Sequence, residues 1–238
     1  MATDELFRQD AYLKECDATV VGVNERGIIL DRTVFYPTGG GQPGDSGELQ
    51  LASGTKIAII EALKGDGSGI VHIPAPDQAM PAIGDKVIAV LNWERRHRHM
   101  RMHTCMHLLC SIVSGDVTGG QIGDGKARLD FNIPGDALDK DHITAELNRL
   151  IKEDHQAVPR WISDEEMAER PELVRTMSVK PPSGQGKVRL LDIAGIDLQP
   201  CGGTHVSHTA EIGQVEVAKI ENKGKQNRRI NLKFAEER

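Results

Sequence analysis

The chain has 238 residues and a formal net charge of −6, and 39% of its residues are hydrophobic, 27% charged and 3% aromatic. This is the composition of a globular protein with room for one large domain or two modest ones. The negative charge excludes long-range attraction of a nucleic acid by the whole molecule, and the scarcity of aromatic residues excludes a surface that binds mainly by base stacking.

The first six residues contain neither the basic nor the apolar part of a secretion signal. Nowhere do about 18 apolar residues follow one another, as a membrane-spanning helix would require. The four cysteines, Cys16, Cys105, Cys110 and Cys201, are too dispersed for a disulfide framework and suit a reducing compartment. We therefore expect a soluble protein of the cytoplasm.

Residues 18–92 consist of short β-rich runs separated by turns, a pattern that predicts a small antiparallel barrel. The expected strands are Ala18–Val23, Gly27–Leu30, Gly47–Ala52, Lys56–Leu63, Ile70–Ile73 and Lys86–Leu91. Between the second and third of them lies the glycine-rich segment Phe35–Gly47, with three consecutive glycines at 39–41. We expect a loop there that needs unusual backbone angles or lets another surface approach closely.

The pattern changes at Trp93, where apolar residues begin to recur at helical spacing and predict a helix over Trp93–Ser114. A second helix is expected over Asp139–Glu153. Helices beside an antiparallel sheet make this part an α+β domain, so we expect a barrel domain over 1–92 and an α+β domain over 93–238. The strand-like runs of the second domain are Ala127–Phe131, Val188–Ile193, Ile212–Ile220 and Arg228–Phe234.

Two short segments carry metal-binding side chains. His103 and His107 are four residues apart on the predicted first helix, which places both imidazoles on one face, about 5–6 Å apart at Cβ. Far downstream, Cys201 and His205 flank two glycines in Cys-Gly-Gly-Thr-His, which excludes a regular helix and indicates a tight turn. One cysteine and three histidines suit tetrahedral zinc.

Neighbouring residues argue against two familiar zinc enzymes. Thr104 stands where a zinc protease of the H-E-x-x-H type needs its glutamate. A zinc deaminase needs a glutamate two residues after its histidine, where Cys105 stands, and a second cysteine where Thr204 stands. Neither peptide hydrolysis nor deamination fits.

Basic residues gather in two places despite the negative net charge. Residues 95–101 contain four arginines, and residues 219–229 contain three lysines and two arginines against Glu221 alone. Such clusters either grip phosphates or form solvated faces, and the pattern leaves both readings open.

Four motifs in this order resemble the stand-alone alanyl-tRNA editing proteins, the AlaX family, over nearly the entire chain. They are Phe35–Gly47, the pair His103 and His107, Cys201–Val206, and Glu221–Arg229. The resemblance implies an N-terminal barrel, an editing domain shared with alanyl- and threonyl-tRNA synthetases, and one bound zinc ion. It also implies hydrolysis of the ester in seryl- or glycyl-tRNA specific for alanine. An aminoacylation domain does not fit in this length, so we expect editing in trans.

The resemblance assigns the zinc ion, and with it the catalytic centre, to His103, His107, Cys201 and His205. If three of these bind, a water in the open position becomes the attacking hydroxide. If all four bind, the shell is closed, and the zinc shapes the pocket or holds the amino end of the substrate.

The remaining assignments concern substrate and RNA. The resemblance places Gln121, with Thr118, at the lip of the amino-acid pocket. Thr38 and Gln42 in the glycine-rich loop are further candidate substrate contacts, and the alternative for these two is a purely structural role. Basic residues of the last motif are expected to contact the tRNA: Lys223, Lys225, Arg228 and Arg229. Two alternatives to a tRNA deacylase are an RNA-binding module with structural zinc and no turnover, and a hydrolase of small aminoacyl esters.

Overall fold

A computed structural model of the protein describes residues 2–67, 69–133, 138–176 and 186–235. The chain forms two compact units, Met1–Arg98 and His99–Arg238, and the division lies within helix α1 (Trp93–Ile112). Our predicted boundary lies at the start of this helix, and the division of functions between 1–92 and 93–238 stays a prediction. None of the described helices has the length and apolarity that crossing a membrane requires.

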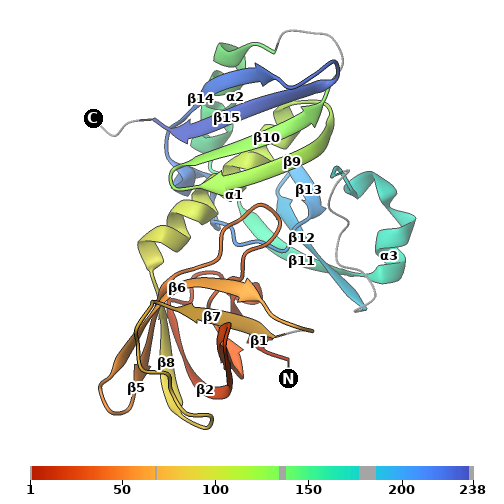
Figure 1. Ribbon diagram of the computed structural model, residues 1–238. Coiled ribbons are helices and arrows are strands. Elements are labelled where there is room, and N and C mark those ends of the chain that lie inside the picture. The colour runs from red at the N-terminus through yellow and green to blue at the C-terminus, as the bar shows by residue number, and fades with distance from the viewer. Residues whose placement is uncertain (1, 68, 134–137, 177–185, 236–238) are drawn as a thin grey trace. The chain divides into compact units, whose positions relative to one another are not determined.

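A closed antiparallel barrel forms the first unit, as predicted (Figure 1). Its strands follow one another around the barrel in the order β2-β3-β7-β6-β5-β8. They are β2 (Glu15–Asn24), β3 (Gly27–Leu30), β5 (Gly47–Leu51), β6 (Lys56–Lys64), β7 (Ile70–Pro74) and β8 (Lys86–Leu91). Two short strands, β1 (Asp4–Glu5) and β4 (Arg32–Thr33), pair in parallel, and a 3-10 helix, η1, covers Leu6–Arg8.

The barrel core follows from the alternation of side chains along each strand. In β8, for example, Val87, Ala89 and Leu91 are buried, whereas Lys86 and Ile88 are exposed. Successive side chains of a strand point to opposite faces, so every second residue fills the interior. The result is one apolar core that extends from Phe7 to Leu91.

One polar side chain, His72 of β7, lies fully buried inside this apolar core. Its Nδ1 is 3.1 Å from the carbonyl oxygen of Ile28, and its Nε2 is 2.8 Å from the hydroxyl oxygen of Thr33. The ring therefore donates from Nδ1 and accepts at Nε2, as a neutral imidazole can. Burial lowers the pKa of His72 to about 4, against the smaller opposing effect of the Ile28 carbonyl.

We expect His72 to make the barrel sensitive to acid. An unfolded histidine binds a proton near its ordinary pKa of 6.5 and the buried one near 4, so stability is retained above pH 6.5 and lost as the pH falls towards 4. At 1.36 kcal/mol per pKa unit, the loss by pH 4.5 is about 2–3 kcal/mol. Urea unfolding followed by Trp93 fluorescence, with Trp161 replaced by phenylalanine, measures it.

The control for this titration is a second histidine. Replacing His72 with glutamine should flatten the dependence of unfolding free energy on pH between 7 and 4.5, whereas the same change at exposed His142 should leave it as in the wild type. Equal pH profiles for the His72 variant and the wild type would contradict the assignment.

One of the four arginines at 95–101 is buried and so cannot contribute to the phosphate-binding patch that the sequence allows. The Arg96 side chain is fully buried, and its Nε lies 3.0 and 2.9 Å from the two carboxylate oxygens of Asp45. Its two other nitrogens donate to the carbonyl oxygens of Ala11 and Val34. A run of arginines in sequence therefore includes one that is an internal ion-pair partner, because helical geometry turns successive residues to different sides.

The glycine-rich segment Phe35–Gly47 is a tightly braced loop. The Thr38 amide donates to the carbonyl of Ala62, and the Thr38 hydroxyl accepts from the amide of Gly44 at 2.7 Å. A Cβ added at Gly44 would lie 2.2 Å from the Ala62 carbonyl oxygen, whereas one at Gly40, with φ of +58°, would meet nothing within 4 Å. Close approach of β6 explains Gly44, and backbone conformation explains Gly40.

These two glycines predict different costs of substitution. Gly44→Ala should lower the unfolding free energy of the barrel by about 1–3 kcal/mol, since backbone must move to admit the methyl group. Gly40→Ala should cost about 1 kcal/mol for a left-handed conformation in open space. Urea unfolding of both variants tests the difference, and a larger loss for Gly40→Ala than for Gly44→Ala would contradict the close contact with β6.

The second unit is α+β, as predicted, with antiparallel sheets of four and three strands (Figure 1). The four-stranded sheet has the order β14-β15-β10-β9 and consists of β9 (Asp116–Gly123), β10 (Lys126–Asn132), β14 (Val215–Asn222) and β15 (Asn227–Phe234). The three-stranded sheet consists of β11 (Ala157–Ser163), β12 (Lys187–Ile193) and β13 (Asp197–Pro200). Short elements complete the unit: α3 (Asp164–Glu169), η2 (Pro171–Leu173) and η3 (Thr209–Ile212).

Helix α2 (Lys140–Lys152) is the second predicted helix and begins where the sequence indicates. The Asp139 side chain caps it by accepting from the amides of Asp141 and His142. Its buried face consists of the apolar residues Ile143, Leu147, Leu150 and Ile151, which recur at helical spacing. The helix packs against β14 of the four-stranded sheet.

Strand β9 is a correction, because none of the strand-like runs expected from the sequence covers residues 116–123. Glycines are rare in strands, and two of them stand at 119 and 120. The structure gives the reason for the second: a Cβ at Gly120 would lie 3.1 Å from the Met106 Cε of α1 and 3.0 Å from Leu129. The glycine lets α1 lie close to the sheet.

Candidate metal centre

Helix α1 carries the first two predicted ligands within a buried stretch. His103 and His107 are 8% and 6% exposed, and their ring centroids are 5.5 Å apart. The four-residue spacing places them on successive turns of one face, as expected. Cys105 and Cys110 of the same helix are buried free thiols outside the four-residue group.

The other two ligands lie in the turn that follows β13. The Cys201 amide donates to the carbonyl of Arg189 on β12 at 3.0 Å. In return, the Arg189 guanidinium donates to the carbonyl oxygens of Cys201 and Gly203 at 2.8 and 3.0 Å. Arg189 thus fixes the turn that presents Cys201 and His205. Sequence reasoning missed this residue because no motif marks an arginine that binds carbonyl oxygens of a distant turn.

The structure brings all four predicted ligands together. One ligand atom from each of His103, His107, Cys201 and His205 lies within 4.8 Å of the others. The Cys201 Sγ is 3.5 Å from the Nε2 of His103 and 3.1 Å from the Nε2 of His205. Tetrahedral zinc with bonds of about 2.3 Å to sulfur and 2.0 Å to nitrogen separates such ligands by roughly 3.5 Å. The group could therefore hold one such ion.

Contacts behind two of the imidazoles indicate which nitrogen each of these rings presents. The Thr104 hydroxyl donates to the Met100 carbonyl, so its contact of 3.3 Å with the His205 Nδ1 requires that nitrogen to donate. The Nε2 of His205 is then a lone-pair donor facing Cys201. On the other side, the Nδ1 of His107 lies 2.9 Å from the Asp197 carboxylate. Thr104, at the position of a protease base, serves here to hold an imidazole.

The charges of the group favour a thiolate. Burial alone would raise the pKa of Cys201, but the imidazoles of His103, His205 and His107 hold it well below its ordinary value. Burial alone would lower the pKa of His107, but the Cys201 thiolate and Asp197 raise it to about 10. Burial, with the neighbouring imidazoles His103 and His107, keeps the pKa of His205 well below 6.5. A thiolate is the form of cysteine that binds metal.

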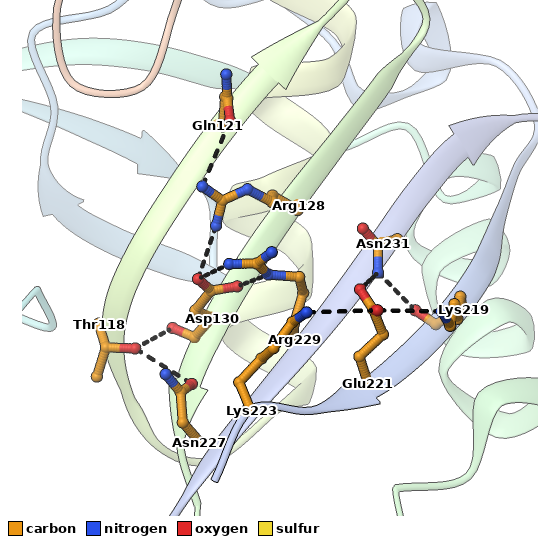
Figure 2. A network of polar contacts seen from close by, with 10 residues as sticks. All are labelled: Thr118, Gln121, Arg128, Asp130, Lys219, Glu221, Lys223, Asn227, Arg229 and Asn231. Atoms are coloured by element: carbon orange, nitrogen blue, oxygen red, sulfur yellow. Dashed lines mark hydrogen bonds and ion pairs between the residues drawn. The ribbon is translucent and has the colours of Figure 1, made fainter.

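The predicted substrate residues Gln121 and Thr118 lie on the face of the four-stranded sheet that is turned away from α1, and the structure does not bring them to the four-ligand group. Gly120 faces α1, so the next residue on β9, Gln121, points to the opposite face. There its side-chain oxygen accepts from Arg128 at 3.4 Å (Figure 2). The Thr118 hydroxyl donates to the backbone oxygen of Asp130. Their part in substrate binding stays a prediction.

Figure 2 also shows that Arg229 belongs to an ion-pair network on this face. Its Nε and one terminal nitrogen lie 2.7 and 2.9 Å from the two oxygens of Asp130, which Arg128 also contacts at 2.7 Å. Burial by itself would raise the pKa of Asp130, but the two guanidinium groups hold it below its ordinary value. The negative carboxylate offsets part of the positive charge that the sequence suggests.

The other predicted RNA contacts lie at the turn between β14 and β15. Arg228 donates to the Asn222 side chain and to the Gly224 carbonyl, both at 3.0 Å, and so braces this turn. Lys225 is exposed at its tip, and the Lys223 ammonium lies 3.5 Å from Glu221. The two lysines are therefore more accessible to a phosphate than the two arginines.

The remaining predicted substrate residues, Thr38 and Gln42, lie in the first unit. Exposed Thr38 uses its hydroxyl within the loop, donating to Glu61 at 2.7 Å. Gln42 is 1% exposed, and its backbone exchanges two hydrogen bonds of 3.0 Å with Gly39. Both residues support the shape of the glycine-rich loop, and their contact with a substrate stays a prediction.

Two family models of known proteins match this chain, one in each of its two units. The family model "Threonyl and Alanyl tRNA synthetase second additional domain" matches residues 188–231, which include the Cys201–His205 turn. The model "tRNA synthetases class II (A)" matches residues 7–95. Both models therefore describe parts of tRNA synthetases, one in each unit.

Individual relatives match nearly the whole chain. Alanyl-tRNA editing protein AlaX-M of Methanosarcina mazei is 36% identical over 96% of this chain and 95% of its own length. AlaX-L of Pyrococcus horikoshii is 33% identical over 96% of this chain and 57% of its own. An alanine–tRNA ligase of Saccharolobus islandicus is 34% identical over 92% of this chain and 25% of its own. Identity and coverage at this level show that the chain belongs to the AlaX family of alanyl-tRNA editing proteins.

Proposed function

We propose that the protein is a cytoplasmic hydrolase that acts in trans on alanine-specific tRNA carrying the wrong amino acid, serine or glycine. The observation that carries the proposal is the convergence of three imidazoles and one thiol within 4.8 Å in a chain of the AlaX family. The reaction cleaves the ester between the amino acid and the terminal ribose of the tRNA, with water as the second substrate.

One zinc ion fits the donor set best. Three imidazole nitrogens and a thiolate are preferred ligands of tetrahedral zinc, and the sulfur–nitrogen distances of 3.1 and 3.5 Å match its shell. With three ligands bound, zinc supplies a water of lowered pKa; with four bound, it supplies an electrostatic anchor for the substrate. The mutual closeness of all four atoms supports the second role.

The direct test is hydrolysis of alanine tRNA charged in turn with serine, glycine and alanine, together with metal analysis of the purified protein. We expect one zinc ion per chain, release of serine or glycine, and retention of alanine. Failure to hydrolyse either mischarged tRNA with zinc at saturation would overturn the proposal. Metal-dependent folding without hydrolysis would support a structural-zinc RNA-binding module instead.

Lys223 and Lys225 provide a further prediction about the tRNA. Replacing both with alanine should raise KM for mischarged tRNA and reduce the slope of log affinity against log salt by about two, because each phosphate contact contributes about one. The same double change at exposed Lys152 and Lys187 is the control. A rate that responds neither to salt nor to the Lys223 and Lys225 changes would indicate a hydrolase of small aminoacyl esters.

A further inference from the structure

The side chain behind His107 is a buried carboxylate that the proposed reaction does not use. Asp197 lies on β13, its side chain is 3% exposed, and its Oδ2 is 2.9 Å from the Nδ1 of His107. Two other polar groups hold the carboxylate: the Gln199 amide nitrogen donates to the same oxygen at 2.7 Å, and the Arg175 guanidinium lies 4.0 Å from Oδ1. Contacts other than the one with the His107 ring therefore also hold the Asp197 carboxylate in place.

The strand that carries Asp197 also leads to the turn with the thiol. Asp197, Gln199 and Cys201 occupy alternate positions along β13 and its end, so the strand directs them to one side. Pairing of Asp197 with Ile193 on β12 sets the register of this strand. The same backbone therefore positions one ligand directly and a second ligand, His107 on α1, through the carboxylate.

A hydrogen bond at one ring nitrogen decides what the other nitrogen can do. When an imidazole donates its Nδ1 hydrogen to a carboxylate, its Nε2 carries the lone pair and the ring cannot rotate freely. We propose that Asp197 is a positioning residue that holds His107 in the Nδ1–H form with Nε2 directed at the metal. This inference rests on the proposed metal site and adds to it a residue outside the ligand set.

The competing reading is that Asp197 only stabilises the fold as a buried partner. The two readings differ in what is lost when the carboxylate becomes an amide. Outer contacts of a metal ligand are worth about 10–100-fold in metal affinity, whereas a purely structural partner affects folding with and without metal alike. Zinc affinity and the stability of the metal-free protein must therefore be measured on the same variants.

The test uses Asp197→Asn and, as a matched control, Asp192→Asn in the same sheet, where the carboxylate pairs with Arg160 instead. Zinc alone is the probe, titrated in competition with a chromophoric chelator on the full chain. We expect Asp197→Asn to weaken zinc binding by about 10–100-fold and to shift the visible spectrum of the cobalt-substituted protein. Asp192→Asn should leave the zinc affinity and the cobalt spectrum as in the wild type. Urea unfolding of the metal-free proteins shows how much of any change in zinc affinity comes from a change in folding stability.

A measurement on the wild type keeps the inference testable if Asp197→Asn does not fold. Nitrogen-15 NMR of the zinc-loaded protein should show a protonated Nδ1 and a metal-bound Nε2 for His107. The opposite assignment, or unchanged zinc affinity in a folded Asp197→Asn protein, would overturn the positioning role while leaving the zinc site in place. A wild type that binds no zinc would overturn this inference and the metal centre together.

Discussion

Replacing Cys201 with alanine is expected to weaken zinc binding and to lower deacylation of mischarged tRNA by roughly 100-fold or more each. Changing a residue that only contacts a metal ligand typically lowers metal affinity by about 10–100-fold. Removing a ligand itself should lower the affinity at least as much, and Cys201 is the only anionic donor among the four residues of the group. The change also leaves three imidazoles facing one another without the thiolate that balances them. Zinc competition titrations and single-turnover hydrolysis of seryl-tRNA measure the two losses.

Cys105→Ala is the matched control, because Cys105 is a buried thiol on α1 that lies outside the four-ligand group. It should retain one zinc ion per chain and wild-type hydrolysis. Undiminished zinc affinity in Cys201→Ala would mean that three histidines hold the metal alone, leaving a position for water. Full activity in Cys201→Ala would show that hydrolysis does not require the Cys201 thiolate.

The two pairs that make up the four-residue group could be predicted from sequence because each pair is local. The spacing of His103 and His107 defines a helix face, and the glycines between Cys201 and His205 define a turn. That the pairs meet, nearly a hundred residues apart, required the family resemblance. Asp197 and Arg189 were missed because their partners belong to other elements, His107 on α1 and the turn after β13, and the local sequence does not show these contacts. Gln199, which donates to Asp197, was missed with them.

Clusters of basic residues in the sequence said less about the site than did the spacing of the histidines and the cysteine. The arginine run at 95–101 and the cluster at 219–229 look basic in sequence, but Arg96 pairs with Asp45, and Arg229 with Asp130. In each case the acidic partner lies about 50 or 100 residues away along the chain, so the local sequence does not show it. Gln121 lies on β9, a strand that the sequence analysis did not expect, and the alternation of side chains along this strand directs Gln121 towards Arg128.

The Arg96–Asp45 pair should be the costliest ion pair of the first unit to break. Arg96→Met leaves a carboxylate that is 1% exposed without its partner, and it removes the donors to the carbonyl oxygens of Ala11 and Val34. Removing one member of a buried pair costs about 3–5 kcal/mol, because the remaining charge stays out of water. Urea unfolding of the barrel, followed by Trp93 fluorescence in a Trp161→Phe background, measures the loss.

Two further variants separate the charge from the hydrogen bonds. Lys56→Met breaks a surface pair of the same barrel, whose lysine is 60% exposed, and should cost no more than about 1 kcal/mol. In the double variant Arg96→Met, Asp45→Leu, no charge is left unpaired, so part of the stability should return. Recovery should stay incomplete, because the Tyr36 amide loses its bond to Asp45 and the Val34 carbonyl loses its donor. A double variant less stable than Arg96→Met would show that these hydrogen bonds, rather than the unpaired carboxylate, dominate the cost.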